Sequence, residues 1–214
     1  MRVLNEKLCA DILETGRKEF LALGYRDASL RHIAASLGVT TGAIYRYYAD
    51  KEALFDALVA QPAQELADRY RAVQQTFAQQ SVEEQVRNLP EVPDEEAGWM
   101  LDFIYDHFDA FKLIACCAGG TKYEHYLDTL AEIEDNAGRA LIEKMAEAGY
   151  SLPQIDDELI HIMSSALFNG IFETVRHDMP REKALRYMAS LRDFYSAGWF
   201  KLLGISDTCV PPVF

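Results

Sequence analysis

The sequence predicts an all-α protein of about nine helices, in which a small three-helix domain at the N-terminus precedes a larger helical domain. Two observations lead to this prediction. Apolar side chains recur at helical spacing through most of the chain, and few segments show the alternation of a strand. Glycine and proline also fall mainly at the ends of the helical patterns, where they start or stop a helix.

Composition excludes several classes of protein. Half of the 214 residues are hydrophobic, which is enough to build one or two cores. The longest apolar stretch, 113–120, is far shorter than the roughly 18 residues of a membrane span, and the charged N-terminus lacks a secretory signal. We therefore expect a cytoplasmic protein with no membrane partner. The four cysteines are Cys9, Cys116, Cys117 and Cys209. Their spacing is not that of a disulfide framework or a zinc site, so we expect reduced thiols and neither a metal nor a cofactor.

The first 50 residues contain three short helical patterns. The first stripe ends at Gly24 and consists of Leu8, Ile12, Gly16, Phe20 and Leu23. The second stripe is capped by Ser29 and ends at Gly38, a residue that tolerates positive φ; it consists of Leu30, Ile33, Ala34 and Leu37. Thr40 then caps a third helix, 41–47, which at about 1.5 Å per residue is about 10 Å long and fits a DNA major groove.

Residues 29–54 resemble the N-terminal domain of TetR-family transcriptional regulators. The resemblance is carried by Ile33-Ala34, Gly38-Val39, Thr40, Gly42-Ala43, Tyr45, Tyr47-Tyr48 and Lys51-Glu52-Ala53-Leu54. Tyr47 and Tyr48 depart from the family, which more often has His and Phe, but both keep an aromatic ring. The resemblance implies a helix-turn-helix DNA-binding domain at 1–50 and a helical effector-binding and dimerisation domain at 51–214.

Side-chain chemistry then suggests individual DNA contacts. Hydroxyl and cationic donors bind phosphate, Arg46 also suits a guanine edge, and Gly42 indicates a close approach to the duplex. Taken one at a time, such residues are more often solvated surface residues, whereas together, at this spacing, they favour DNA reading. The predicted DNA-binding residues are Ser29, Arg31, Thr40, Thr41, Gly42, Tyr45, Arg46, Tyr47 and Lys51.

The remaining helices follow from caps and breaks. Asp50 is a plausible cap for a long helix in which Pro62 predicts a kink or break near residue 60. An acidic, proline-containing loop is expected at 88–96. Helices are then predicted over about 97–117 and 121–148, and from near Asp156 and Arg181 onward.

Two further sites are predicted in the larger domain. The resemblance implies that the last two helices form a dimer interface, although an internal core explains their stripes equally well. The interface residues are Met163, Ala166, Gly170, Met188, Leu191, Tyr195 and Trp199. Aromatic residues with polar tips also suggest a small-molecule pocket, although such stripes more often form plain core. The ligand-binding residues are Phe103, His107, Phe111, Tyr123, Tyr126, Asn169 and Phe172.

The charge is unevenly distributed. Residues 1–60 hold eight basic and eight acidic side chains, so the whole net charge of −13 falls on residues 61–214. An acidic body behind a neutral DNA-reading domain disfavours non-specific DNA binding, but acidic surfaces also simply aid solubility. Both explanations remain open.

Together these features predict a ligand-responsive transcriptional regulator, a homodimeric repressor that a small molecule releases from a palindromic DNA operator. No catalytic motif is present: the single Glu158-x-x-His161 lacks the second such motif of a di-iron site, and no phosphate-binding loop or nucleophile elbow occurs. We therefore do not expect an enzyme. The alternative is a helical small-molecule sensor or enzyme whose N-terminal domain does not read DNA.

Overall fold

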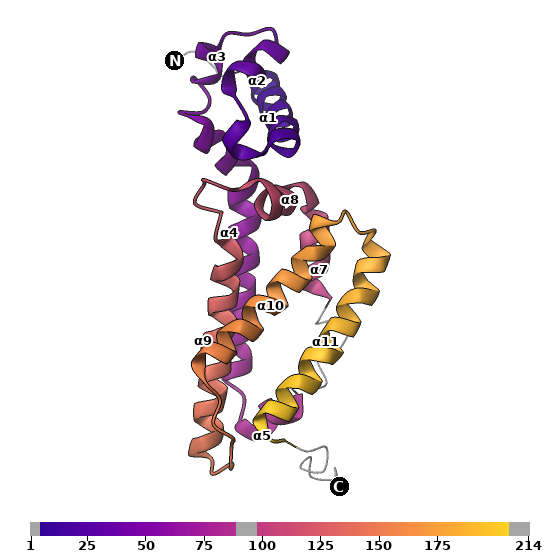
Figure 1. The fold of residues 1–214 in the computed structure, drawn as a ribbon. Helices are drawn as coiled ribbons and strands as arrows, with labels where there is room; N and C mark the ends of the chain where they lie inside the picture. The colour runs from indigo at the N-terminus through magenta and orange to yellow at the C-terminus, as the bar shows by residue number, and fades with distance from the viewer. Residues whose placement is uncertain (1–4, 89–97, 206–214) are drawn as a thin grey trace. The chain divides into compact units, whose positions relative to one another are not determined.

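The computed structural model describes residues 5–88 and 98–205, which form helices and turns without a strand (Figure 1). The predicted loop at 88–96 falls almost wholly outside these residues, as does Cys209. In chain order the described helices are α1 (Glu6–Asp27), α2 (Leu30–Ser36), α3 (Thr41–Ile44), α4 (Lys51–Ala78), α5 (Val82–Asn88), α7 (Trp99–Asp106), α8 (Phe108–Cys117), α9 (Tyr126–Glu147), α10 (Asp157–Arg176) and α11 (Arg181–Leu203).

The helices pack into two compact units that are interleaved along the chain. The N-terminal unit comprises the described residues of 1–65 together with 106–126, and the C-terminal unit comprises those of 66–105 and 127–214. Helix α4 begins in one unit and ends in the other. The predicted functional division at residue 50 stays a prediction, because compactness alone does not show where a function ends.

The core of the N-terminal unit forms where α1 meets the first turns of α4. Phe20, Tyr25 and Phe55 form an aromatic cluster. The rings of Tyr25 and Phe20 lie edge-on to the ring of Phe55, at centroid distances of 5.5 Å and 5.1 Å respectively. Gly16 permits this close approach, because a Cβ there would lie 3.0 Å from Leu54 Cδ2. The fully buried side chains around these rings include Ile12, Ile33 and Ile44.

A segment from the middle of the chain completes the N-terminal unit. Helix α8 packs on α1, and Arg17 forms an ion pair with Asp109. Beyond α8, the Tyr123 hydroxyl donates to Asp56 Oδ1 at 2.5 Å, and the same carboxylate pairs with Lys122. The helical pattern alone does not indicate this long-range packing.

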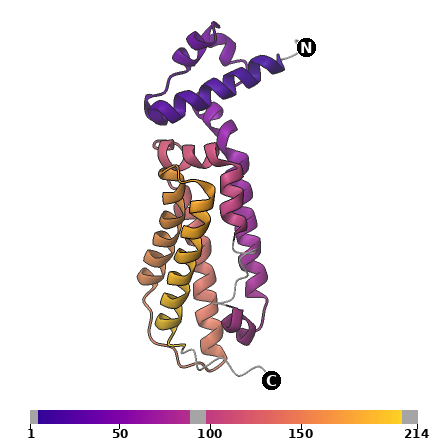
Figure 2. The same ribbon diagram turned by 90° about the vertical axis from the view of Figure 1, so that its right-hand side faces the viewer.

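The C-terminal unit contains the second half of α4 with α5, α7, α9, α10 and α11. Figure 2 shows α10 and α11 side by side, and they are in contact. At one end a second apolar cluster surrounds the fully buried Met145; it contains Val86, Leu141, Leu203 and Ile205. Among the described residues, no helix is long and apolar enough to cross a membrane.

Several predicted helix boundaries were wrong. Helix α4 runs through Pro62, so of the kink or break predicted near residue 60 the break does not occur. The helix predicted over 97–117 is interrupted at His107, whose backbone is not helical, so that α7 and α8 are separate. Since apolar residues recur at the same spacing on both sides, periodicity does not mark this break. The helix expected from 121 begins at Tyr126, because Thr121 instead forms a turn by donating to the Ala118 carbonyl.

Candidate nucleic-acid interface and a cavity in the C-terminal unit

The helix-turn-helix geometry forms where the local signals predicted it. Ser29 Oγ accepts from the Arg31 amide at 3.2 Å, and Thr40 Oγ1 accepts from the Ala43 amide at 3.3 Å, so both predicted caps are confirmed. Gly38 has φ +66°, which confirms the expected turn. Helix α3 is shorter than the predicted 41–47, since residues 45–47 continue as turns.

Part of the predicted DNA-contacting set is accessible. Tyr45 is 54% exposed, Gly42 and Arg46 are exposed, and Thr41 is half-buried. A Cβ on Gly42 would meet no heavy atom closer than Thr40 Oγ1 at 3.8 Å, so the fold itself does not demand glycine there. Ile44, on the opposite side of the helix, is fully buried. The motif therefore presents a polar surface on a fixed apolar base.

Two of the predicted contacts already have partners inside the protein. The Lys51 ammonium donates to the carbonyls of Tyr25, Arg26 and Ala28 at 2.6, 3.1 and 3.0 Å. The Tyr47 hydroxyl accepts from the Asn5 amide at 3.1 Å. In this geometry Lys51 holds the end of α1, and its predicted phosphate contact stays a prediction.

Sequence reasoning missed a buried carboxylate that positions the motif. Glu19, on α1, is only 9% exposed, and its Oε2 lies 2.6 Å from His32 Nδ1 on α2. Its other oxygen accepts from the Ser29 amide at 3.4 Å. Glu19 therefore fixes the start of α2, which carries Arg31 on the exposed side. A glutamate inside the apolar stripe of α1 was the only signal for this role.

The C-terminal unit contains a cavity of about 600 Å³ that is partly open to solvent. Its walls come from α4, α7, α9, α10 and α11, and they are mainly apolar. A smaller cavity of about 80 Å³ has three lining residues in common with the larger one, namely Gln74, Glu134 and Trp199. The aromatic residues of the larger cavity are Tyr70, Trp99, Phe168, Tyr195, Trp199 and Phe200.

One carboxyl group lies in the cavity wall. Glu134 Oε2 accepts from Gln74 Nε2 at 2.7 Å and from the Tyr70 hydroxyl. Burial raises the pKa of Glu134 above its ordinary value, the Tyr70 hydrogen bond opposes this rise, and the neighbouring Asp135 carboxylate adds to it. The charged form of Glu134 is therefore disfavoured in the folded protein.

Glu134→Gln is expected to raise the melting temperature near neutral pH by about 2–4 °C, because the amide keeps a hydrogen-bond acceptor and removes a buried charge. Folding raises the pKa of Glu134, so ionisation of this carboxyl group destabilises the folded wild-type protein. This destabilisation is absent below the unfolded-state pKa of 4.5 and grows as the pH rises toward the folded-state pKa. Thermal unfolding of both proteins between pH 4 and 8 measures this. A constant difference across that range would contradict the prediction.

The predicted ligand-binding residues do not line either cavity. His107, Phe111, Tyr123 and Tyr126 belong to the N-terminal unit, where the Tyr126 hydroxyl donates to the Ala63 carbonyl at 2.7 Å. Phe103, Asn169 and Phe172 lie in the C-terminal unit but outside the cavity walls. Of the predicted set, Phe111, Tyr123, Tyr126 and Phe172 are buried, but the helical stripes did not indicate which aromatic residues border empty space.

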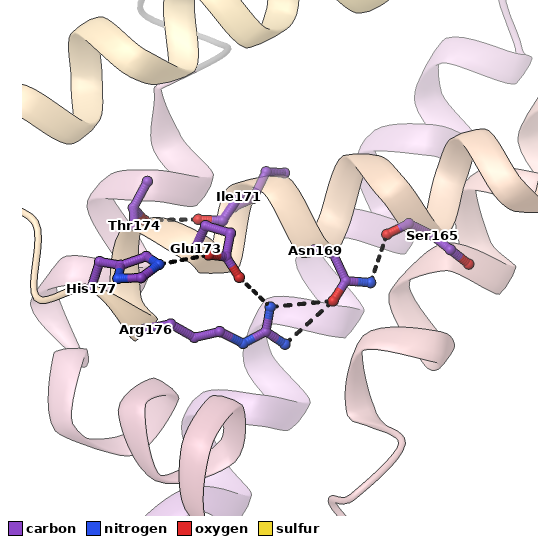
Figure 3. Close-up of polar contacts among 7 residues, drawn as sticks. All are labelled: Ser165, Asn169, Ile171, Glu173, Thr174, Arg176 and His177. Atoms are coloured by element: carbon purple, nitrogen blue, oxygen red, sulfur yellow. Dashed lines mark hydrogen bonds and ion pairs between the residues drawn. The ribbon is translucent and has the colours of Figure 1, made fainter.

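Asn169 shows how a polar residue of α10 is used instead. Figure 3 shows its amide donating to the Ser165 carbonyl, at 2.9 Å, while its oxygen accepts from Arg176 at 3.3 Å. Arg176 also pairs with Glu173 at 2.9 Å, and Glu173 with His177. The side chain of Asn169 is thus part of an exposed polar chain along α10.

The predicted interface residues divide into three groups. Met188, Tyr195 and Trp199 line the cavity. Gly170 faces Leu191 within the same chain, since a Cβ on the glycine would lie 3.3 Å from Leu191 Cδ2. Met163 is half-buried and Ala166 is exposed. The stripes therefore serve the internal packing and the cavity as well as the surface.

The outer side of α10 and α11 carries exposed apolar residues that the prediction did not name. Ile162 is 59% exposed and Phe194 is 69% exposed, and Tyr187 is 37% exposed. Ile162 lies one turn from Ala166, and Phe194 lies two turns from Tyr187, so each pair shares a helix face. We call Ile162, Ala166, Tyr187 and Phe194 the outer apolar face.

Comparison with known proteins supports the DNA-reading interpretation. Residues 12–58 match the family model described as "Bacterial regulatory proteins, tetR family". The HTH-type transcriptional repressor AcnR of Corynebacterium efficiens is 23% identical over 160 residues, which is 75% of this chain and 77% of the relative. An HTH-type transcriptional regulator of Mycobacterium bovis is 37% identical over 67 residues, 31% of this chain and 29% of the relative.

Solved structures agree in fold across both units. The fatty acid degradation regulator FadR of Bacillus halodurans has a TM-score of 0.55 and 17% identity, covering 88% of this chain and 98% of its own. FadR of Bacillus subtilis in complex with stearoyl-CoA has a TM-score of 0.50 and 16% identity, with the same coverage. Residues 12–58 therefore match the DNA-binding domain of the tetR family of bacterial regulatory proteins, and the chain as a whole shares its all-α fold with these solved structures.

Proposed function

We propose that the protein is a dimeric transcriptional repressor that binds a palindromic operator and is released from it by a small molecule in the C-terminal cavity. The observation that carries the DNA-binding part is the capped helix-turn-helix with Gly42, Tyr45 and Arg46 exposed on a buried base. The second helix of such a motif enters the major groove with its N-terminal residues. The family match over residues 12–58 supports the same assignment over the non-DNA alternative.

Selection of random duplexes by the purified protein tests this function. Enrichment of a palindrome with half-sites about 34–36 Å apart is expected, because two symmetric helix-turn-helix motifs read successive major grooves. If no duplex is enriched at moderate salt, with or without candidate ligands, the proposal is wrong.

Arg46→Ala is expected to weaken binding to all duplexes and to reduce the slope of log affinity against log salt by about 1. Arg46 is exposed and forms no ion pair with the described residues, so its loss leaves the fold intact. Fluorescence anisotropy at several salt concentrations measures both quantities. Arg71→Ala removes the same charge from an exposed site in the C-terminal unit and serves as the control. An unchanged slope would exclude a phosphate contact by Arg46.

Dimerisation through α10 and α11 is supported by the outer apolar face. Large apolar side chains as exposed as Ile162 and Phe194, on two adjacent helices, are typical of an interface. A two-fold axis at this face would join four helices, two from each subunit.

Helix α4 offers a route for coupling. Its first turns supply Leu54 and Phe55 to the core of the N-terminal unit, and its later turns supply Tyr70, Val73 and Gln74 to the cavity wall. A ligand that moves the later turns therefore acts on the helix that anchors the DNA-reading motif. Regulation of this kind needs a coupling free energy of only about 1–3 kcal/mol.

A further inference from the structure

Among the described residues, the wall of the larger cavity combines many aromatic rings with one half-buried carboxyl group, that of Glu134. Tyr70 and Phe168 lie edge to face at a centroid distance of 5.4 Å, and both tryptophans of the chain, Trp99 and Trp199, also line the space. The volume of about 600 Å³ is that of a site for a drug-sized molecule.

Within residues 5–88 and 98–205, the carboxyl group of Glu134 has no cationic partner. Both of its hydrogen bonds, from Tyr70 and Gln74, fall on Oε2. No lysine, arginine or histidine forms an ion pair with it within the described part of the chain. The charged group that acts on it is another acid, Asp135, whose Oδ2 is instead 2.9 Å from His161 Nδ1. A desolvated acid without a cationic partner is a site at which a cation would be stabilised.

The surrounding rings favour the same charge. Aromatic faces carry negative potential and attract organic cations, most strongly where water is excluded. Two arginines, Arg186 and Arg192, also line the cavity, but Arg186 is exposed and Arg192 has a carboxylate partner in Asp193 at 3.6 Å. Glu134 is therefore held by neutral donors alone, whereas Arg186 is exposed to solvent and Arg192 is paired with Asp193.

We propose that the cavity takes a lipophilic organic cation, with an amine or quaternary ammonium group against Glu134 and an apolar body among the aromatic rings. This inference rests on the proposed role of the cavity as the effector site. Tyr70 and Gln74 are then positioning residues, because they hold the carboxylate by Oε2 and leave Oε1 to the ligand.

The test uses the intrinsic fluorescence of Trp99 and Trp199, because both tryptophans border the cavity. The probes are dodecyltrimethylammonium and dodecanoate, which share a chain length and differ in charge, below their micellar concentrations. Saturable quenching by the cation, with weaker binding of the anion, is expected. Glu134→Gln should weaken binding of the cation about 30-fold or more, since it removes one partner of a buried charge pair. Glu132→Gln removes the same charge from an exposed position of α9 and should have no effect.

The outcomes separate this inference from the proposed function. Tighter binding of dodecanoate, or equal binding of the cation by wild type and Glu134→Gln, would overturn the cation assignment. The thermal stability of Glu134→Gln, measured alongside, excludes unfolding as the cause of lost binding. If the cation saturates the cavity but leaves operator binding unchanged, the assignment holds and the cavity is not the regulatory site.

Discussion

Lys51→Ala is expected to lower the free energy of unfolding by about 2–3 kcal/mol, because charge-assisted hydrogen bonds are the strong ones and three carbonyls lose theirs together. Those carbonyls belong to Tyr25, Arg26 and Ala28, where α1 ends. The ammonium also lies 4.4 Å from the centroid of the Tyr25 ring. Thermal and denaturant unfolding measure the loss.

The same variant decides between two roles for Lys51. Under the geometry described above, the folded variant binds DNA with an unchanged salt slope, because no phosphate contact is lost. If the slope of log affinity against log salt instead falls by about 1, Lys51 contacts a phosphate, as the sequence predicted. Lys18→Ala, which removes an exposed ammonium paired with Glu14 at 3.0 Å, is the control and should cost less than about 1 kcal/mol.

Phe194→Asp is expected to convert the proposed dimer into a monomer. Phe194 is the most exposed large apolar residue of the outer apolar face, and in a two-fold interface each substitution counts twice. If each site loses about 2 kcal/mol, the dissociation constant rises by about three orders of magnitude. Operator affinity should fall as the dimer dissociates, because a monomer carries one helix-turn-helix motif and contacts only one of the two half-sites.

Light scattering after size-exclusion chromatography, at several protein concentrations, measures the molar mass and so the oligomeric state of Phe194→Asp and wild type. Thr129→Asp adds one negative charge at an exposed position of α9 and should leave the dimer intact. Since the Phe194 side chain is 69% exposed, the substitution should not unfold the subunit. A Phe194→Asp dimer as tight as wild type would place the interface on another surface.

The DNA-reading motif was predictable because its signals are local. A cap such as Ser29 or Thr40 acts on an amide two or three residues away, and Gly38 is required by its own backbone angle. These rules depend on a few neighbouring residues, which any sequence displays. The exposed set at Gly42, Tyr45 and Arg46 followed from the same register.

The cavity was not predictable for the opposite reason. Buried core and cavity wall have the same composition and the same helical spacing, so Phe172 and Phe168 look alike in the sequence. Only the packing of five helices decides that Phe168 borders the empty space while Phe172 does not. The pairing of Tyr70 with Glu134 joins residues 64 positions apart, which no local pattern reveals.

Because residues 106–126 belong to the N-terminal unit, they affect when this unit can fold during synthesis and how it can be transplanted into a chimera. Arg17 and Asp56 find their partners at Asp109, Lys122 and Tyr123, so the unit cannot close until residue 126 has left the ribosome. During synthesis the half-built unit exposes the side of α1 that α8 later covers. A chimera that transplants residues 1–65 alone onto another regulator would inherit that uncovered side, whereas one that also carries 106–126 would not.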